Sequence, residues 1–104
     1  MQIQVNTDNH VHGSENLIGR VQEMVEGAVS HFSERITRIE VHLSDENSAK
    51  GGADDKRCML EARLGGLEPI AVTHQAESLQ LAIDGAAEKL EKAIGHTVGR
   101  LNER

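Results

Sequence analysis

The sequence predicts an α+β fold in which a four-stranded mixed sheet carries two helices on one face, in the order β-α-β-β-β-α. Three observations carry this prediction. Apolar residues recur at helical spacing over residues 15–32 and 76–104, and they alternate with polar residues in four shorter stretches. Turn-forming residues separate these stretches. Each strand and helix then has one apolar side, and packing both helices on one face of the sheet is the simplest way to bury them all.

The first half of the chain predicts a strand, a helix and a second strand. Residues 2–7 alternate between apolar and polar side chains, which indicates a short strand. Ser14 can cap a helix by accepting a hydrogen bond from an amide of its first turn, and we expect this helix to end near Phe32. A crossover helix makes the two strands parallel neighbours. The apolar side of the second strand is formed by Ile39, Val41 and Leu43.

The second half predicts an antiparallel meander followed by a long helix. Residues 45–55 contain two adjacent glycines and four acidic residues without apolar periodicity, so we expect a mobile loop. A strand over residues 56–64 leads to Gly65–Gly66, which suits a hairpin turn because glycine readily adopts positive φ angles. Pro69 cannot donate a ladder hydrogen bond. The returning strand, residues 67–74, is therefore expected to be an edge strand or to begin irregularly.

The last helix is expected to bury one face and to expose a basic edge. Ser78 precedes it and can cap its first turn. Its apolar stripe contains Leu79, Ile83, Ala86, Ala87, Leu90, Ile94, Val98 and Leu101. At about 100° per residue, four basic side chains fall within about 80° of one another beside this stripe. They are Lys89, Lys92, His96 and Arg100. The predicted core consists of Val25, Val41, Leu60, Val72, Ile83, Leu90 and Ile94.

Length and composition limit the classes of function. We expect the 104 residues to form one domain, residues 1–104, with an aliphatic core, since Phe32 is the only aromatic residue. The net charge of −6 opposes non-specific binding to nucleic acid, although a local basic stripe acts within a Debye length of about 8–10 Å. No apolar run is long enough for a membrane helix and no signal peptide is evident, so we expect a cytoplasmic protein without membrane contact.

Residues that could support catalysis or metal binding do not converge. Histidines are numerous, but none has zinc-type spacing with Cys58, and His10 and His12 are more simply loop or surface residues. Cys58 lies on the inward side of a strand, which favours a buried thiol over a nucleophile. His74 and Glu77 have no phosphate loop, serine motif or paired carboxylates beside them. We therefore expect that this protein is not an enzyme and that it binds no cofactor, metal or small-molecule substrate.

One stretch of the last helix resembles a known family. The run Leu79–Gln80–Leu81–Ala82–Ile83–Asp84–Gly85, followed by Lys89–Leu90, is similar to the second helix of the ribosome hibernation promoting factors. That family is also called ribosome-associated inhibitor or sigma-factor modulation protein. The opening strand and the chain length fit it as well. The resemblance implies a protein that binds the small ribosomal subunit, in the channel for messenger and transfer RNA, and keeps idle ribosomes inactive in stationary phase or stress.

The resemblance also implies which side chains contact ribosomal RNA, and it shows departures from the family pattern. The matching basic positions are Lys89, Lys92 and Arg100, with His96 a weaker match and Arg20 a candidate on the first helix. Gln80 stands where the family commonly has Tyr, and the first helix carries Glu15, Glu23 and Glu26 where many members are more basic. We expect the C-terminal domain with which long members pair ribosomes to be absent.

Alternative interpretations stay open at this stage. The basic edge could meet phosphates, or it could be an ordinary solvated surface, because bases late in a helix suit its dipole and Glu88–Lys92 is an i,i+4 pair. The alternative function is that of a diverged relative which binds a protein partner through the outer face of the sheet. That face would display Arg38, Glu40, His42, Met59, Glu61 and Arg63. A small enzyme or metal binder is a third, weaker hypothesis.

Overall fold

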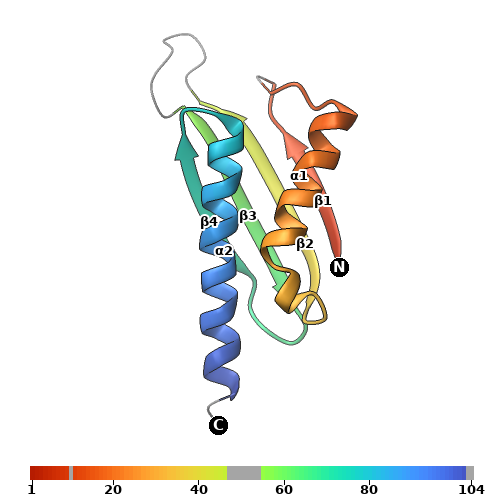
Figure 1. The fold of residues 1–104 in the computed structure, drawn as a ribbon, viewed down its shortest axis with the longest axis vertical. Helices are drawn as coiled ribbons and strands as arrows, with labels where there is room; N and C mark the ends of the chain where they lie inside the picture. Colours follow the sequence, from red (N-terminus) through yellow and green to blue (C-terminus); the bar gives the residue numbers. More distant parts are fainter. Residues whose placement is uncertain (10, 47–54, 103–104) are drawn as a thin grey trace.

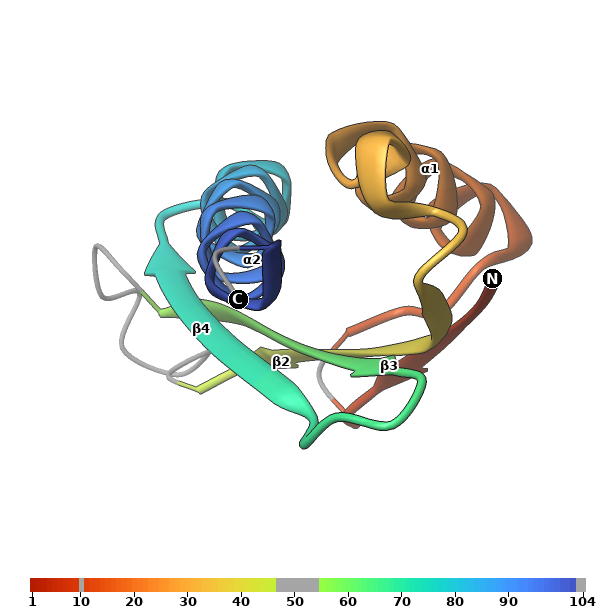
Figure 2. The same cartoon turned by 90° about the horizontal axis from the view of Figure 1, so that it is seen from below.

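The structure is a four-stranded mixed sheet with both helices on one face, as the apolar patterns predict (Figures 1 and 2). The computed structural model describes residues 1–9, 11–46 and 55–102. Its main elements are β1 Gln2–Thr7, α1 Glu15–Ala28, β2 Ile36–Asp45, β3 Lys56–Leu64, β4 Ile70–Ala76 and α2 Leu79–Asn102. The strands lie in the order β1-β2-β3-β4, with β1 parallel to β2 and the other pairs antiparallel. β1 and β4 are therefore the edge strands.

The strand register builds the inner face of the sheet from rows of apolar side chains. One row crosses all four strands through Val5, Val41, Leu60 and Val72. Six members of the predicted core are buried: Val25, Val41, Leu60, Ile83, Leu90 and Ile94. The prediction that Val72 belongs to the buried core was wrong, since its side chain is only partly buried and packs against that core. It lies on the edge strand β4, which has a neighbouring strand on one side only.

α1 begins where its cap predicts but ends early. The amide of Leu17 donates to Ser14 Oγ at 3.1 Å, which satisfies one amide of the first turn. The helix ends at Ala28 rather than near Phe32, and residues Ser30–Phe32 form a short 3-10 turn. This tighter winding turns the chain toward β2 while Phe32 still packs against the core.

The connection between β3 and β4 is longer than a tight glycine hairpin. Only Gly66 has a positive φ, of 75°, and the amide of Leu67 donates to the carbonyl of Leu64 at 3.2 Å. β4 then begins directly after Pro69, three positions later than the predicted start at residue 67. The prediction that this strand is an edge strand is confirmed, because β4 pairs with β3 alone in the described sheet.

α2 begins after the predicted cap. Ser78 Oγ accepts a hydrogen bond from the amide of Leu81 at 3.2 Å, and the helix starts at Leu79, whereas Ala76 belongs to β4. The buried side of the helix is the predicted apolar stripe, with Leu79 and Leu101 partly buried at its ends. Within the described residues, neither helix combines the length and the hydropathy that a bilayer crossing requires.

A group of charged side chains ties the end of β2 to the start of β3. The amide of Glu46 donates to the carbonyl of Asp55 at 2.8 Å, and Lys56 Nζ lies 2.7 Å from Asp55 Oδ1 and 3.4 Å from Asp45 Oδ2. The hydrogen bond to Asp55 raises the pKa of Lys56. Asp45, expected in the loop, belongs to β2. Residues 47–54 lie outside the described residues, so the mobility of this loop stays a prediction.

Candidate functional site

The predicted basic edge of α2 lies beside β4, at the free edge of the sheet. Lys89 Nζ donates to the carbonyl of Thr73 in β4 at 2.8 Å. Lys92, His96 and Arg100 follow Lys89 at steps of three or four residues, so they lie on the same side of the helix. All four side chains are exposed. The structure therefore brings these four predicted residues together, and we call them the basic edge.

Two of the four side chains of the basic edge already have partners inside the protein. Lys92 Nζ lies 3.1 Å from Glu88 Oε1, and the two side chains are 74% and 67% exposed. Such an exposed i,i+4 pair contributes only about 0.3–0.5 kcal/mol, so a phosphate can replace Glu88 at little cost. Lys89 is held by the Thr73 carbonyl. Within the described part of the chain, the side chains of Arg100 and His96 have no hydrogen bond or ion pair.

Arg20 is exposed on α1 and lies apart from the basic edge. α1 packs against β1, whereas α2 packs against β3 and β4 (Figure 2). The basic edge faces β4, on the side of α2 that is turned away from α1. The structure therefore does not bring Arg20 together with the other four predicted residues.

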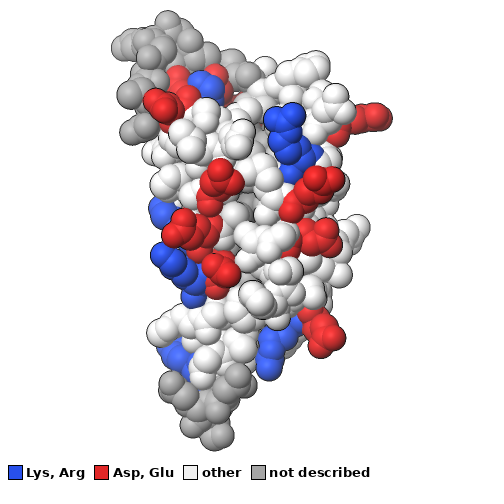
Figure 3. All heavy atoms as spheres, in the orientation of Figure 1, with Lys and Arg blue, Asp and Glu red and all other residues white. Residues whose placement is uncertain are grey.

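The surface formed by the two helices is not basic as a whole. Figure 3 shows acidic side chains over both helices, with the basic ones interspersed or nearer the margins. The acids on these helices are Glu15, Glu23, Glu26, Asp84, Glu88 and Glu91. A polyanion is repelled by such a surface, so its favourable approach is along the β4 side, where the basic edge lies.

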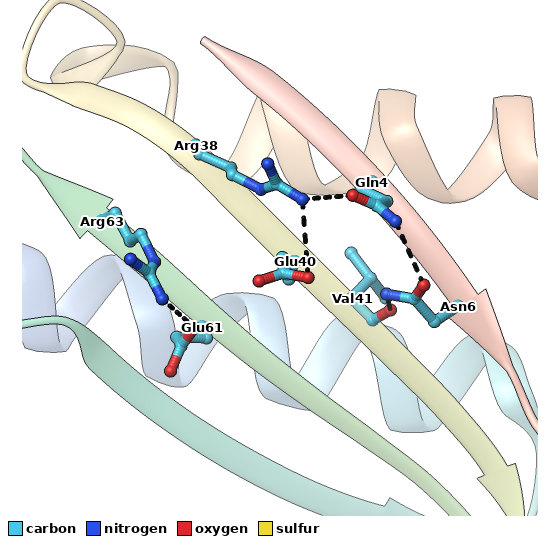
Figure 4. Close-up of polar contacts among 7 residues, drawn as sticks. All are labelled: Gln4, Asn6, Arg38, Glu40, Val41, Glu61 and Arg63. Carbon is cyan, nitrogen blue, oxygen red and sulfur yellow. Dashed lines mark hydrogen bonds and ion pairs between the residues drawn. The ribbon is translucent and has the colours of Figure 1, made fainter.

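The outer face of the sheet carries a second group of charged side chains. Both helices lie on the opposite face (Figure 2), and Figure 4 shows the polar network on the outer one. Arg38 Nη2 donates to Gln4 Oε1 and lies 3.6 Å from Glu40 Oε1. Arg63 Nη2 lies 3.7 Å from Glu61 Oε1. Alternation along each strand predicts which residues face outward, but it does not predict which of them stand opposite one another.

A hollow at the end of the molecule was not anticipated from the sequence. It has a volume of about 310 Å³. Its walls come from three separate segments and comprise Glu34, Arg35, Thr37, Leu64, Gly65, Leu67 and Leu101. No spacing along the chain signals such a site.

His74 packs against α2 rather than forming an acid–base pair with Glu77. A Cβ on Gly85 would overlap the imidazole of His74, so the helix and the sheet approach each other closely at this glycine. Among the residues that the structure describes, no three His, Cys, Asp or Glu side chains are placed to hold a metal ion. His12 is exposed, and His10 lies outside the described residues.

Cys58 is fully buried on the inner face of β3. Burial raises the pKa of its thiol to about 12. The thiolate is the nucleophilic form, so at neutral pH this group is almost wholly in its unreactive state. The interpretation of Cys58 as a buried, inert thiol is the one that fits this environment.

We expect Cys58 to resist a soluble thiol reagent at about pH 8 until the protein unfolds, because both burial and the raised pKa suppress the thiolate. The rate of reaction with a chromogenic disulfide reagent, measured in native buffer and in denaturant, checks this. The unfolded chain is the control for full reactivity. Rapid, stoichiometric labelling of the native protein would contradict the expectation.

The fold and the surface define a small α+β protein with one cationic edge on a largely acidic helical layer. Residues 3–102 match the family described as Sigma 54 modulation protein / S30EA ribosomal protein, and the chain belongs to that family. This match confirms the resemblance seen in the sequence of α2. The sequence matches no curated protein.

Solved structures of other proteins share this fold. A ribosomal subunit interface protein from Coxiella burnetii superposes with a TM-score of 0.73 and 18% identity, over 95% of this chain and 99% of its own. The N-terminal domain of Protein Y from Thermus thermophilus gives a TM-score of 0.74 and 18% identity, over 93% and 99%. At this level of identity the likeness shows the fold alone.

Proposed function

We propose that this protein binds the small ribosomal subunit through its RNA and holds idle ribosomes inactive in stationary phase or stress. The observation that carries the proposal is the family match across residues 3–102. The name of one similar structure, a ribosomal subunit interface protein, agrees with a ribosomal partner. The proposal describes a cytoplasmic protein of one domain, residues 1–104, which acts by occupying a site and needs neither catalysis nor a cofactor.

The basic edge of α2 supplies the proposed contacts with ribosomal RNA. Lys89, Lys92 and Arg100 meet backbone phosphates, and each phosphate that they neutralise releases counterions, which makes the binding sensitive to salt. His96 adds positive charge only when it is protonated. Arg20 on α1 is a separate, secondary contact.

The acidic net charge does not prevent such a contact. The basic edge runs from Lys89 to Arg100, which spans about 16 Å at a rise of 1.5 Å per residue. Charges farther than a Debye length of about 8 Å are largely screened at physiological salt. A phosphate at the basic edge therefore responds mainly to the nearby charges, which are these cations and Glu88 beside Lys92, while the acids on the rest of the helices limit how the RNA can approach.

Changing Lys89, Lys92 and Arg100 together to Gln is expected to weaken binding to purified small subunits and to make its salt dependence shallower. The slope of log affinity against log salt should fall by roughly 0.7–0.9 for each phosphate that the variant no longer neutralises. Gln keeps the helix propensity nearly constant, so the variant should stay folded. Sedimentation with small subunits across a salt series measures both the affinity and the slope.

Glu88→Gln is the matched control, because it changes one charge on the same helix and frees Lys92 from its partner. It should bind as well as the wild type or more tightly. A triple variant that binds with wild-type affinity and slope would place the RNA site elsewhere. A wild type that does not bind even at low salt would instead favour the protein partner on the outer face of the sheet.

A further inference from the structure

The outer face of the sheet places like charges directly opposite each other. The register of β2 and β3 pairs Arg38 with Arg63, and it pairs Glu40 with Glu61 on the same face. Directly opposed residues in an antiparallel pair have Cβ atoms about 4.5–5.5 Å apart, and like charges at this spacing repel. Two guanidinium groups are thus kept side by side. If Glu61 and Arg63 exchanged places on β3, each Arg would instead stand opposite a Glu.

The neighbouring glutamates do not neutralise this pair fully. Each lies beside the arginine of its own strand, at 3.6 Å for Arg38–Glu40 and 3.7 Å for Arg63–Glu61 (Figure 4). These distances exceed those of a charge-assisted hydrogen bond. The arginine side chains are 39% and 56% exposed, whereas the glutamates are 25% and 30% exposed. The positive groups are therefore the more accessible part of this face.

Arg38 is held in position from the neighbouring strand. Its Nη2 donates to Gln4 Oε1, Gln4 in turn donates to Asn6 Oδ1 at 3.4 Å, and Asn6 Nδ2 donates to the carbonyl of Val41 at 3.2 Å. Arg38 Nε is buried and has no hydrogen-bond partner among the described residues. The side chain is thus held in position, and because Nε is out of reach of solvent, a ligand on this face would meet the exposed part of the side chain.

We propose that Arg38 and Arg63 together receive a phosphate of the RNA backbone, so that the outer face of the sheet is a second RNA-contact surface besides the basic edge. Guanidinium groups present planar sets of N–H donors that match phosphate oxygens. A phosphate between the two groups also replaces their mutual repulsion with attraction to a shared anion. This inference rests on the proposed function, because it names a further surface for the same ribosomal RNA.

The surroundings favour a polymer backbone over a free phosphate or a base. The two arginines are about half exposed on an open sheet, so nothing encloses a small anion. Phe32 is the only Phe, Tyr or Trp of the chain, and it packs against the core, so none of these large aromatic side chains is available on the outer face to stack on a base. The contact is therefore to phosphate, which positions the RNA without reading its sequence.

The test compares Arg38→Gln/Arg63→Gln with Glu40→Gln/Glu61→Gln for binding to purified small subunits across a salt series. The arginine variant should bind more weakly, with a slope shallower by roughly 0.7–0.9, because the pair neutralises one shared phosphate in the wild type. The glutamate variant should bind more tightly than the wild type. Both variants change two charges on the same two strands. Only an electrostatic contact predicts that one variant lowers the affinity for the small subunit and the other raises it. Denaturant unfolding of each variant verifies the fold.

An arginine variant that is folded and binds with wild-type affinity and slope overturns the inference and leaves the proposed function standing. If the wild type itself does not bind small subunits at low salt, the proposed function fails, and a second measurement decides the inference. In that measurement the Nε–Hε resonances of Arg38 and Arg63 are followed while a short oligouridylate is added. Shifts of both resonances that disappear at high salt support the phosphate contact, and unshifted resonances overturn it.

Discussion

Replacing Leu90 with Ala is expected to lower the free energy of unfolding by about 2–5 kcal/mol. Leu90 is fully buried, on the side of α2 that packs over β3 and β4. Truncation removes buried methyl groups and leaves a cavity that close-packed neighbours fill only in part. Chemical denaturation, with the midpoint and slope compared with the wild type, measures the loss.

Leu81→Ala is the matched control, because it makes the same chemical change on the same helix at a side chain that is 47% exposed. Its effect should stay within about 0.5 kcal/mol. An unchanged midpoint for Leu90→Ala would show that Leu90 is not a core residue. Equal losses for the two variants would instead show that Ala perturbs the helix itself.

The order of the elements could be predicted because every element keeps one apolar side. The alternation over residues 56–64 corresponds to β3, and the helical stripe of α2 is buried as expected. The boundaries were less predictable. Phe32 continues the helical periodicity of α1 but lies in a 3-10 turn. Its apolar position reflects packing against the core, which the 3-10 turn achieves as well as a continued α-helix would. Likewise, Leu67 fits a strand pattern but belongs to the connection before Pro69.

The basic edge of α2 and the charged outer face of the sheet differ in how far they can be predicted from the sequence. Helical spacing alone determines that Lys89 and Arg100 share one side of α2, whereas the place of that side beside β4 depends on tertiary packing. The opposition of Arg38 and Arg63 depends on strand register. That register shifts between Ile36 and Arg38, and no short turn links β2 to β3 to set it from the sequence.

Gly85→Ala is expected to destabilise the protein by about 1–3 kcal/mol, which is opposite in sign to the usual effect of this change in a helix. In an exposed helix interior, Ala is more favourable than Gly by roughly 1 kcal/mol. Here the new Cβ would overlap the imidazole of His74. His74 stands opposite Cys58 on the inner face of the sheet, so the ring lies between β4 and α2. Either the ring must rotate or the helix must move away from the sheet.

Two further variants separate the overlap from helix propensity. Gly99→Ala changes the same helix where no atom lies within 4 Å of the added Cβ, so it should stabilise the protein by up to roughly 1 kcal/mol. In a His74→Ala background, Gly85→Ala should recover this favourable sign, because the overlapping ring is gone. Denaturant unfolding of the four variants in the double-mutant cycle gives the coupling between the two positions. If Gly85→Ala stabilises the wild-type background as Gly99→Ala does, the His74 ring moves aside freely, and the close approach does not require glycine.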